Sequence, residues 1–133
     1  MTGHLLEPPA WPRPSGYSNG IVTTGQTIFL AGQIGWDPVS SRVAEGMAAQ
    51  VEFALRNIVT ILTEAGAHST DIVRMTWFVT DMEQYRRDTK AIGRAYRGIM
   101  GKHFPTMSVI GVASLVERDA LVEIEATAVI NGG

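Results

Sequence analysis

Two stretches with helical spacing of apolar residues predict two helices. In the first, over residues 47–65, the apolar positions recur every three or four residues and form one stripe: Val51, Ala54, Leu55, Ile58 and Leu62. Gly66 follows where a left-handed residue commonly ends a helix. The second helix is predicted to begin at Asp81, with Gln84 at the capping-box position, and to end near Gly101.

Alternation with a period of two predicts three strands around these helices. They cover Ile72–Thr80, Met107–Val112 and Leu121–Ile130. The first has one side formed by Val73, Met75, Trp77 and Val79, and the opposite side by Arg74, Thr76, Phe78 and Thr80.

The N-terminal third reads as an arm, a hairpin and a loop. Residues 1–16 contain four of the prolines and are expected to form an extended, irregular arm. Tyr17–Gln33 is predicted to be a hairpin, with Gly25-Gln26 separating its two strands. Gly35–Ser41 is predicted to be a loop.

The resulting order of elements predicts an α+β fold with a mixed sheet, formed by a single domain over residues 1–133. Strand, helix and strand follow one another twice, so both helices should lie on one face of the sheet. The other face carries Phe78, and nothing else in the chain remains to cover it. We therefore expect further copies of the chain to bury this face in a homo-oligomer.

Composition narrows the chemistry. The chain of 133 residues has no cysteine, which excludes disulfides, zinc–thiolate sites and thiol nucleophiles and suits a cytoplasmic protein. Its net charge is −2 and its basic residues are scattered, so nucleic acid is not the expected partner. No apolar run reaches the roughly 18 residues of a membrane span, and no membrane association is expected.

Two catalytic patterns are present by composition but lack their structural context. Residues 16–20 match G-x-S-x-G, yet a strand rather than a helix is predicted to follow them. The three histidines, at positions 4, 68 and 103, have no metal-ligand spacing, so no metal site is expected.

Four segments together resemble the Rid (reactive intermediate deaminase, formerly YjgF) family. They are GYSN at 16–19, FLAGQI with the following DP at 29–38, DIV through FVTDM at 71–82, and YRGIMGKHFPTMS with LVEIEA between 96 and 126. The resemblance covers about residues 14–130. It implies a chorismate-mutase-like trimer with a central barrel, small-molecule clefts between subunits, and hydrolysis of enamines or imines to carbonyl compounds and ammonia without a cofactor.

The resemblance also assigns site residues. In active members an arginine clamps the substrate carboxylate, and that position holds Met107 here. Methionine offers a soft apolar contact instead of a charge, so the substrate should differ from simple 2-imino acids. Ser108 follows, and Val109 replaces a cysteine whose backbone N–H can still serve as a donor. Ala31 replaces a serine common in the second strand.

Two residues carry the implied chemistry. Glu123 matches the glutamate that orients the attacking water, and Tyr17 matches the tyrosine that closes the cleft. By spacing alone, Glu123 and Glu125 share one side of their strand and read as solvated carboxylates, and Tyr17 reads equally as a packed turn residue.

Three arginines are candidates to replace the arginine that Met107 displaces. Two functions other than deamination also remain open. Arg13, Arg74 and Arg118 each read more readily as solvent-facing charges. The alternatives to a deaminase are a non-catalytic ligand-binding or chaperone-like trimer, and a ribonuclease or translation inhibitor, which the acidic balance disfavours.

Overall fold

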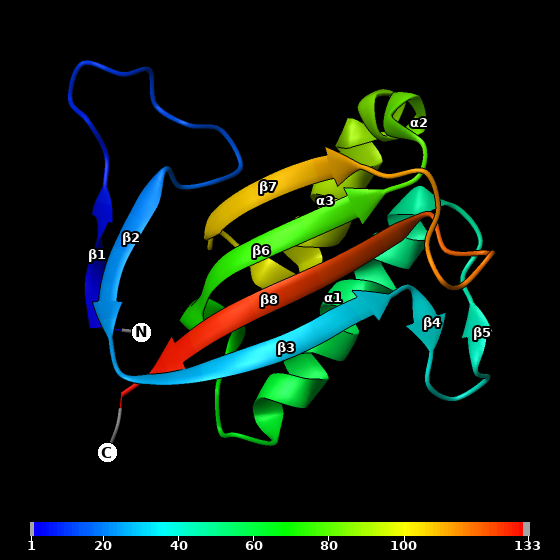
Figure 1. Cartoon of the computed structure of the whole chain (residues 1–133), viewed down its shortest axis with the longest axis horizontal. Helices are drawn as coiled ribbons and strands as arrows, with labels where there is room; N and C mark the ends of the chain where they lie inside the picture. The colour runs from blue at the N-terminus through cyan, green and yellow to red at the C-terminus, as the bar shows by residue number, and fades with distance from the viewer. Residues whose placement is uncertain (1, 132–133) are drawn as a thin grey trace.

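A four-stranded sheet forms the centre of the molecule. The computed structural model describes residues 2–131 (Figure 1). The strand order is β3 (Gln26–Ile34), β8 (Val122–Ile130), β6 (Ile72–Val79) and β7 (Thr106–Gly111). Strand β8 is antiparallel to both of its neighbours, whereas β7 is parallel to β6. The expected mixed sheet of an α+β fold is therefore confirmed.

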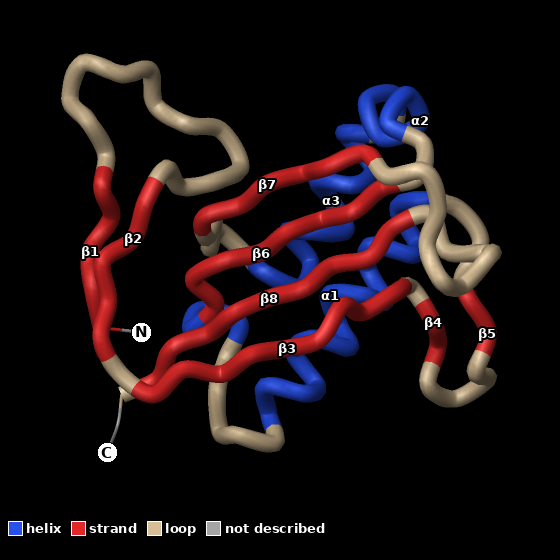
Figure 2. The backbone as a smooth tube through the Cα atoms, viewed as in Figure 1, coloured by secondary structure: helices blue, strands red, loops and turns tan. Residues whose placement is uncertain are grey.

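The helices cover one face of this sheet, as the sequence predicted. In Figure 2 the helices α1 (Met47–Thr63) and α3 (Thr89–Met100) both lie behind the strands. Helix α1 buries the predicted apolar stripe, and the turn after it reaches Gly66 with φ of 69°. The opposing strand residues are buried as well, among them Met75, Trp77, Val79, Val122 and Ile124. At the start of β6 a bulge puts Ile72 rather than Val73 into the core.

The second predicted helix is broken into two pieces. Helix α2 (Met82–Arg87) and helix α3 are separated at Asp88. Tyr85 of α2 and Tyr96 of α3 both contact Trp77, with ring centroids 6.4 and 6.3 Å away. A straight helix would hold the Cα atoms of these tyrosines about 16 Å apart, at 1.5 Å per residue. The break therefore lets both aromatic rings pack on the same indole.

The predicted N-terminal hairpin is wrong in its pairing. Strand β2 (Gly20–Thr24) pairs with β1 (Thr2–Leu6), a strand inside the region expected to be an irregular arm, while β3 pairs with β8. The chain turns at Gly25, whose φ is 144°, and a Cβ atom there would lie 2.2 Å from the carbonyl oxygen of Ile130. Packing against the end of β8 thus directs β2 away from β3. Figure 1 shows β1 and β2 standing beside the end of the sheet.

The predicted loop after β3 contains a small two-stranded ribbon. Its strands are β4 (Trp36–Asp37) and β5 (Arg42–Val43), and a 3-10 turn (Ser69–Asp71) follows α1 later in the chain. The ribbon begins where the backbone touches α1, because a Cβ atom on Gly35 would lie 2.3 Å from the Cα atom of Gln50.

The face of the sheet opposite the helices is uncovered by any element within residues 2–131 (Figure 2). Cross-strand register places Phe29, Phe78, Ser108 and Ile110 on this face, together with Arg74, Thr76, Glu123, Glu125 and Thr127. Phe29 is 82 % exposed and Ile110 is 45 % exposed. In the described part of the chain, no helix is long and apolar enough to cross a membrane.

Candidate functional site

The turn that carries Tyr17 is fastened to the edge of the sheet. The backbone N–H of Ser18 donates to the carbonyl of Pro105 at 3.0 Å, and its hydroxyl donates to the carbonyl of Phe104 at 2.5 Å. These bonds hold the segment against the start of β7. Tyr17 itself is 43 % exposed. Its side chain is therefore positioned beside the edge strand and is open to a ligand.

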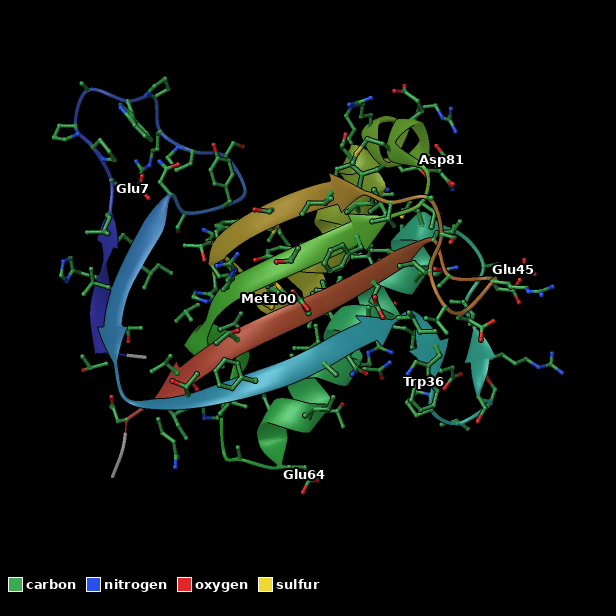
Figure 3. The ribbon with its side chains drawn as sticks, viewed as in Figure 1. Glu7, Trp36, Glu45, Glu64, Asp81 and Met100 are labelled. Atoms are coloured by element: carbon green, nitrogen blue, oxygen red, sulfur yellow. The ribbon has the colours of Figure 1, made fainter. Side chains whose placement is uncertain are left out.

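The loop before this turn is held by a carboxylate. Glu7, labelled in Figure 3, lies just after β1, and its side chain accepts a hydrogen bond from the Asn19 amide at 3.0 Å. The contact links the two ends of the proline-rich segment. Glu7 also lines a cavity of about 670 Å³ between this segment and residues 102–104, and it is the one carboxylate among the described residues that do so.

Met107 stands between two cavities on β7. The first, of about 540 Å³, is lined by Tyr17, Ser18, Asn19, Arg74, Thr106, Ser108 and neighbouring apolar residues. The second, the aromatic cavity of about 230 Å³, is lined by four aromatic rings and by Ile92, Arg97 and small residues; the rings are those of Trp77, Tyr85, Tyr96 and Phe104. Met107 and Val109 pack against the core on the helix side, in register with Met75 and Trp77.

Among the described residues that line the aromatic cavity, Arg97 alone carries a formal charge. The Tyr96 hydroxyl donates to the carbonyl of His103 at 2.5 Å, and its ring stacks on Phe104 at a centroid distance of 5.6 Å. Burial raises the pKa of Tyr85 and raises that of Tyr96 well above its usual range, so both phenols are neutral. The buried indole N–H of Trp77 has no hydrogen-bond partner. The cavity therefore offers aromatic surface for an apolar or aromatic group, with the Arg97 side chain and one unbonded N–H at its walls.

The backbone of Val109 faces outward from the sheet. The N–H of Val112 donates to the carbonyl of Val79 at 2.9 Å, which fixes the even-numbered residues of β7 as those bonded to β6. In a parallel ladder the alternate residues point their N–H and C=O groups the other way. The N–H of Val109 therefore points away from β6, at the open edge of the sheet, as a donor role requires.

Glu123 lies elsewhere on the same chain. It is opposite Phe78 on β6 and Ile34 on β3, on the uncovered face, and shares that face with Glu125 as the spacing predicted. Its side chain rests over Gly32, where a Cβ atom would come within 2.8 Å of a carboxylate oxygen. Glycine at that position leaves the carboxylate its space.

One chain does not bring Glu123 to Tyr17 and Met107. Met107 is in register with Met75 and then Ala126, so Glu123 is two strands away and three residues along β8. At about 4.8 Å per strand and 3.3 Å per residue, the backbones are roughly 14 Å apart. The predicted site residues therefore form two groups within a chain, and one pocket that contains both needs a second copy.

The remaining predicted residues belong to the uncovered face. Ala31 lines a cavity of about 340 Å³ together with Phe29, Arg74, Thr76 and Glu125. Ser108 lines the Tyr17 cavity. Arg74 borders both cavities, and its side chain is exposed, in agreement with the solvent-facing expectation. The alternation of Arg74 with Thr76 and Phe78 in the sequence indicates that these residues share one face of the strand. The sequence does not indicate which distant segment lies beside Arg74.

Ser18 of the G-x-S-x-G segment and the ring of His103 both contact backbone carbonyl groups. The Ser18 hydroxyl is bonded to a backbone carbonyl, and the His103 ring lies 2.7 Å from the carbonyl oxygen of Ile72 rather than near a serine. Among the described residues, no group of three or more histidine or carboxylate side chains is placed to hold a metal ion.

These features define a class of protein: a small α+β chain with one uncovered sheet face and ligand-sized cavities along an edge strand. The family whose model matches, over residues 10–130, is described as Endoribonuclease L-PSP. The chain is 36 % identical to the 2-iminobutanoate/2-iminopropanoate deaminase of Salmonella typhimurium, over 81 % of this chain and 83 % of that protein.

Solved structures agree with this match. The Rid-family protein YyfB of Yersinia pestis, described as of unknown function, superimposes with a TM-score of 0.84 at 28 % identity, over 98 % of this chain and 100 % of that one. The structure of Escherichia coli TdcF with bound serine gives 0.70 at 31 % identity, over 96 % and 99 % of the two chains. The chain belongs to the Rid family, and the resemblance read from its motifs is confirmed.

Proposed function

We propose that this protein is an enamine or imine deaminase that hydrolyses a C=N bond in clefts between the subunits of a homotrimer. The observation that carries the proposal is the division of the site. Tyr17, Met107 and the Val109 N–H lie at one edge of the chain, and Glu123 lies across the sheet. A second copy that brings its Glu123 to this edge completes one pocket.

The reaction needs only what such a pocket offers. An enamine first tautomerises to an imine, water then adds to the imine carbon, and cleavage of the C–N bond releases ammonia and leaves a carbonyl group. Glu123 accepts a hydrogen bond from the attacking water and orients it, while the Val109 N–H stabilises negative charge that develops in the transition state. No electrons are transferred, so no redox cofactor is required.

The substrate is proposed to differ from a simple 2-imino acid. Met107 brings no charge to the position of the family's clamp, and it borders a cavity lined by aromatic rings. That environment favours a substrate with a larger apolar side chain. Relatives named as 2-iminobutanoate/2-iminopropanoate deaminases support the reaction class.

Ammonia release tests the proposal directly. We expect the wild-type protein to accelerate ammonia release from 2-aminoacrylate-derived or bulkier imines, and Glu123→Gln to lower the rate about 10²–10⁴-fold. Glu117→Gln removes the same charge from an exposed position in the loop before β8 and should leave the rate unchanged. Equal rates for wild type and Glu123→Gln on every imine would instead favour a non-catalytic ligand-binding trimer.

A further inference from the structure

The cavity beside Tyr17 contains a positive charge that does not come from the family's clamp position. Its lining is otherwise neutral: Tyr17, Ser18, Asn19, Thr106 and Ser108 supply hydroxyl and amide groups, and Leu6, Ile21, Met75 and Met107 supply apolar surface. Among the described residues that line it, Arg74 alone carries a formal charge. Within one chain this cavity has one cation and no carboxylate; with the proposed Glu123 of a second copy beside it, it would offer a cation for an anionic group and a carboxylate for the attacking water.

Arg74 approaches this cavity from the strand next to Met107. It lies opposite Thr106 on β7 and Thr127 on β8, so it shares the uncovered face with Ser108. Its side chain is exposed, and within residues 2–131 the ion pairs found are Glu52 with Arg56 and Glu83 with Arg86. Glu125 borders the adjoining cavity but forms no such pair with Arg74. The guanidinium is therefore available to a ligand.

The dimensions suit a small acid. A cavity of about 540 Å³ lies within the range of small-molecule sites, about 300–1,000 Å³. A guanidinium binds a carboxylate through two parallel hydrogen bonds, which an uncharged methionine cannot form. The Ser108 hydroxyl faces the same side and offers a further donor.

We propose that Arg74 binds the carboxylate of the substrate and thereby replaces the clamp that Met107 cannot provide. This inference rests on the proposed deaminase function and narrows its substrate to an acid. The acid group lies at the uncovered face beside Tyr17, and the apolar side chain of the same molecule rests on Met107, which lines the same cavity.

The other cations are placed differently. Arg13 and Lys102 line the cavity under the proline-rich segment, which shares Tyr17 and Ser18 but also contains Glu7, and neither lines a cavity with Met107. Arg97 does line a cavity with Met107, but it is the aromatic cavity beside Ile92 and Tyr96 of α3, not the one that contains Ser108. Arg118 is an exposed loop residue that lines none of these cavities. Position thus selects Arg74 and makes Arg13 a matched control.

Binding of a stable acid tests this role without any turnover. We would titrate the wild-type protein with 4-methyl-2-oxopentanoate, an acid with a branched apolar side chain, and with its neutral amide, and follow binding by calorimetry or by NMR chemical shifts. Arg74→Gln should weaken binding of the acid at least tenfold, which corresponds to about 1.4 kcal/mol, and leave binding of the amide unchanged. Arg74→Lys should retain part of the affinity for the acid, and Arg13→Gln should retain all of it.

A double variant separates charge from packing. Met107→Arg restores a guanidinium from the neighbouring strand, so in the Arg74→Gln background it should recover affinity for the acid. Thermal unfolding of each variant confirms that the fold is retained before titration.

Several results would overturn the role of Arg74. These are an unchanged acid affinity in Arg74→Gln, an equal loss for acid and amide in a folded variant, a loss seen only in Arg13→Gln, or no acid binding by the wild type at millimolar concentration. The two proposals can be contradicted separately. If acid binding depends on Arg74 but no ammonia is released, the deaminase proposal is wrong and the anion site at Arg74 is supported. If ammonia release depends on Glu123 but not on Arg74, the deaminase proposal is supported and the role of Arg74 is wrong.

Discussion

At the scale of single residues, a buried glutamine joins three parts of the chain. Gln50 is 2 % exposed, and its amide donates to the carbonyls of Ala44 and Asp119 at 2.9 and 3.0 Å. Its side-chain oxygen accepts the N–H of Leu121 at 2.7 Å. The loop that precedes β8 is thereby attached to α1. Because Glu123 follows two residues after Leu121, this glutamine also fixes where the proposed catalytic strand begins.

Replacement of Gln50 by an apolar residue should lower the stability of the protein, although the helix face around it is apolar. Gln50→Leu leaves two buried carbonyls and one N–H without partners, and we expect a loss of about 2–4 kcal/mol in the free energy of unfolding. Urea denaturation measures it, at a fixed protein concentration because the proposed subunit association would contribute to stability. Glu52→Gln, on the exposed side of the same helix, should change it by less than about 0.5 kcal/mol. A neutral Gln50→Leu would show that water or rearranged backbone satisfies these groups.

The residues of the candidate site could be predicted from the sequence only in part. Glu123, Tyr17 and Met107 are identified because their motifs resemble those of a family. Spacing alone favours a solvated surface carboxylate for Glu123 and leaves Tyr17 evenly divided between a site residue and a packed turn residue. Arg74 was correctly placed on a strand face by alternation. Its meaning depended on the Tyr17 turn lying across the end of that face, which is a contact between distant segments.

At the scale of elements, the region between β6 and β7 differs from the single helix that its apolar periodicity predicts. The apolar pattern predicted one helix, because Tyr85, Ile92 and Tyr96 fit a single stripe. The structure divides it at Asp88 so that two tyrosines share one tryptophan. Tertiary packing on Trp77 therefore overrides a continuous local pattern, and it forms the aromatic wall beside Met107.

The two helix starts in this region should respond differently to mutation. Asp81, labelled in Figure 3, caps α2 by accepting the N–H of Gln84 at 3.0 Å, whereas Asp88 precedes α3 without a side-chain cap bond. We expect Asp81→Ala to lower the free energy of unfolding by about 1 kcal/mol and Asp88→Ala to lower it by less than half of that. Chemical denaturation of both variants tests the difference. A larger effect at Asp88 would mean that the break between the helices, not the cap, needs an acidic residue.

At the scale of the whole molecule, the uncovered sheet face combines exposed apolar surface with two residues of the proposed site. It carries Phe29 at 82 % exposure and Ile110 at 45 %, and it also carries Glu123 and Arg74. Exposed apolar surface of this kind is typically buried between copies of a chain. The proposed site would require the same association, because its residues form two separate groups within one chain. Assembly and catalysis are thus expected to depend on one surface.

A charge on this face should separate the subunits. We expect the wild-type protein to have the mass of three chains by light scattering, and Phe29→Asp to shift it toward one chain because the buried charge opposes association. Val39→Asp is the matched control: Val39 is 95 % exposed, lies in the turn between β4 and β5, and should leave the mass unchanged. A monomeric wild type, or a Phe29→Asp protein that stays trimeric, would contradict this arrangement. Loss of ammonia release together with the trimer would tie activity to the shared cleft.

The sequence by itself determined the helix stripe of α1, the three central strands, the α+β class and the family, because each of these rests on local periodicity or on short contiguous motifs. Tertiary structure alone decided that β2 pairs with β1, that the second helix breaks, and that Arg74 meets the Tyr17 turn. Those outcomes depend on long-range contacts, such as Gly25 against the end of β8 and two tyrosines on one indole. Local patterns do not encode which distant surfaces meet, and it is at such meetings that this protein forms its cavities.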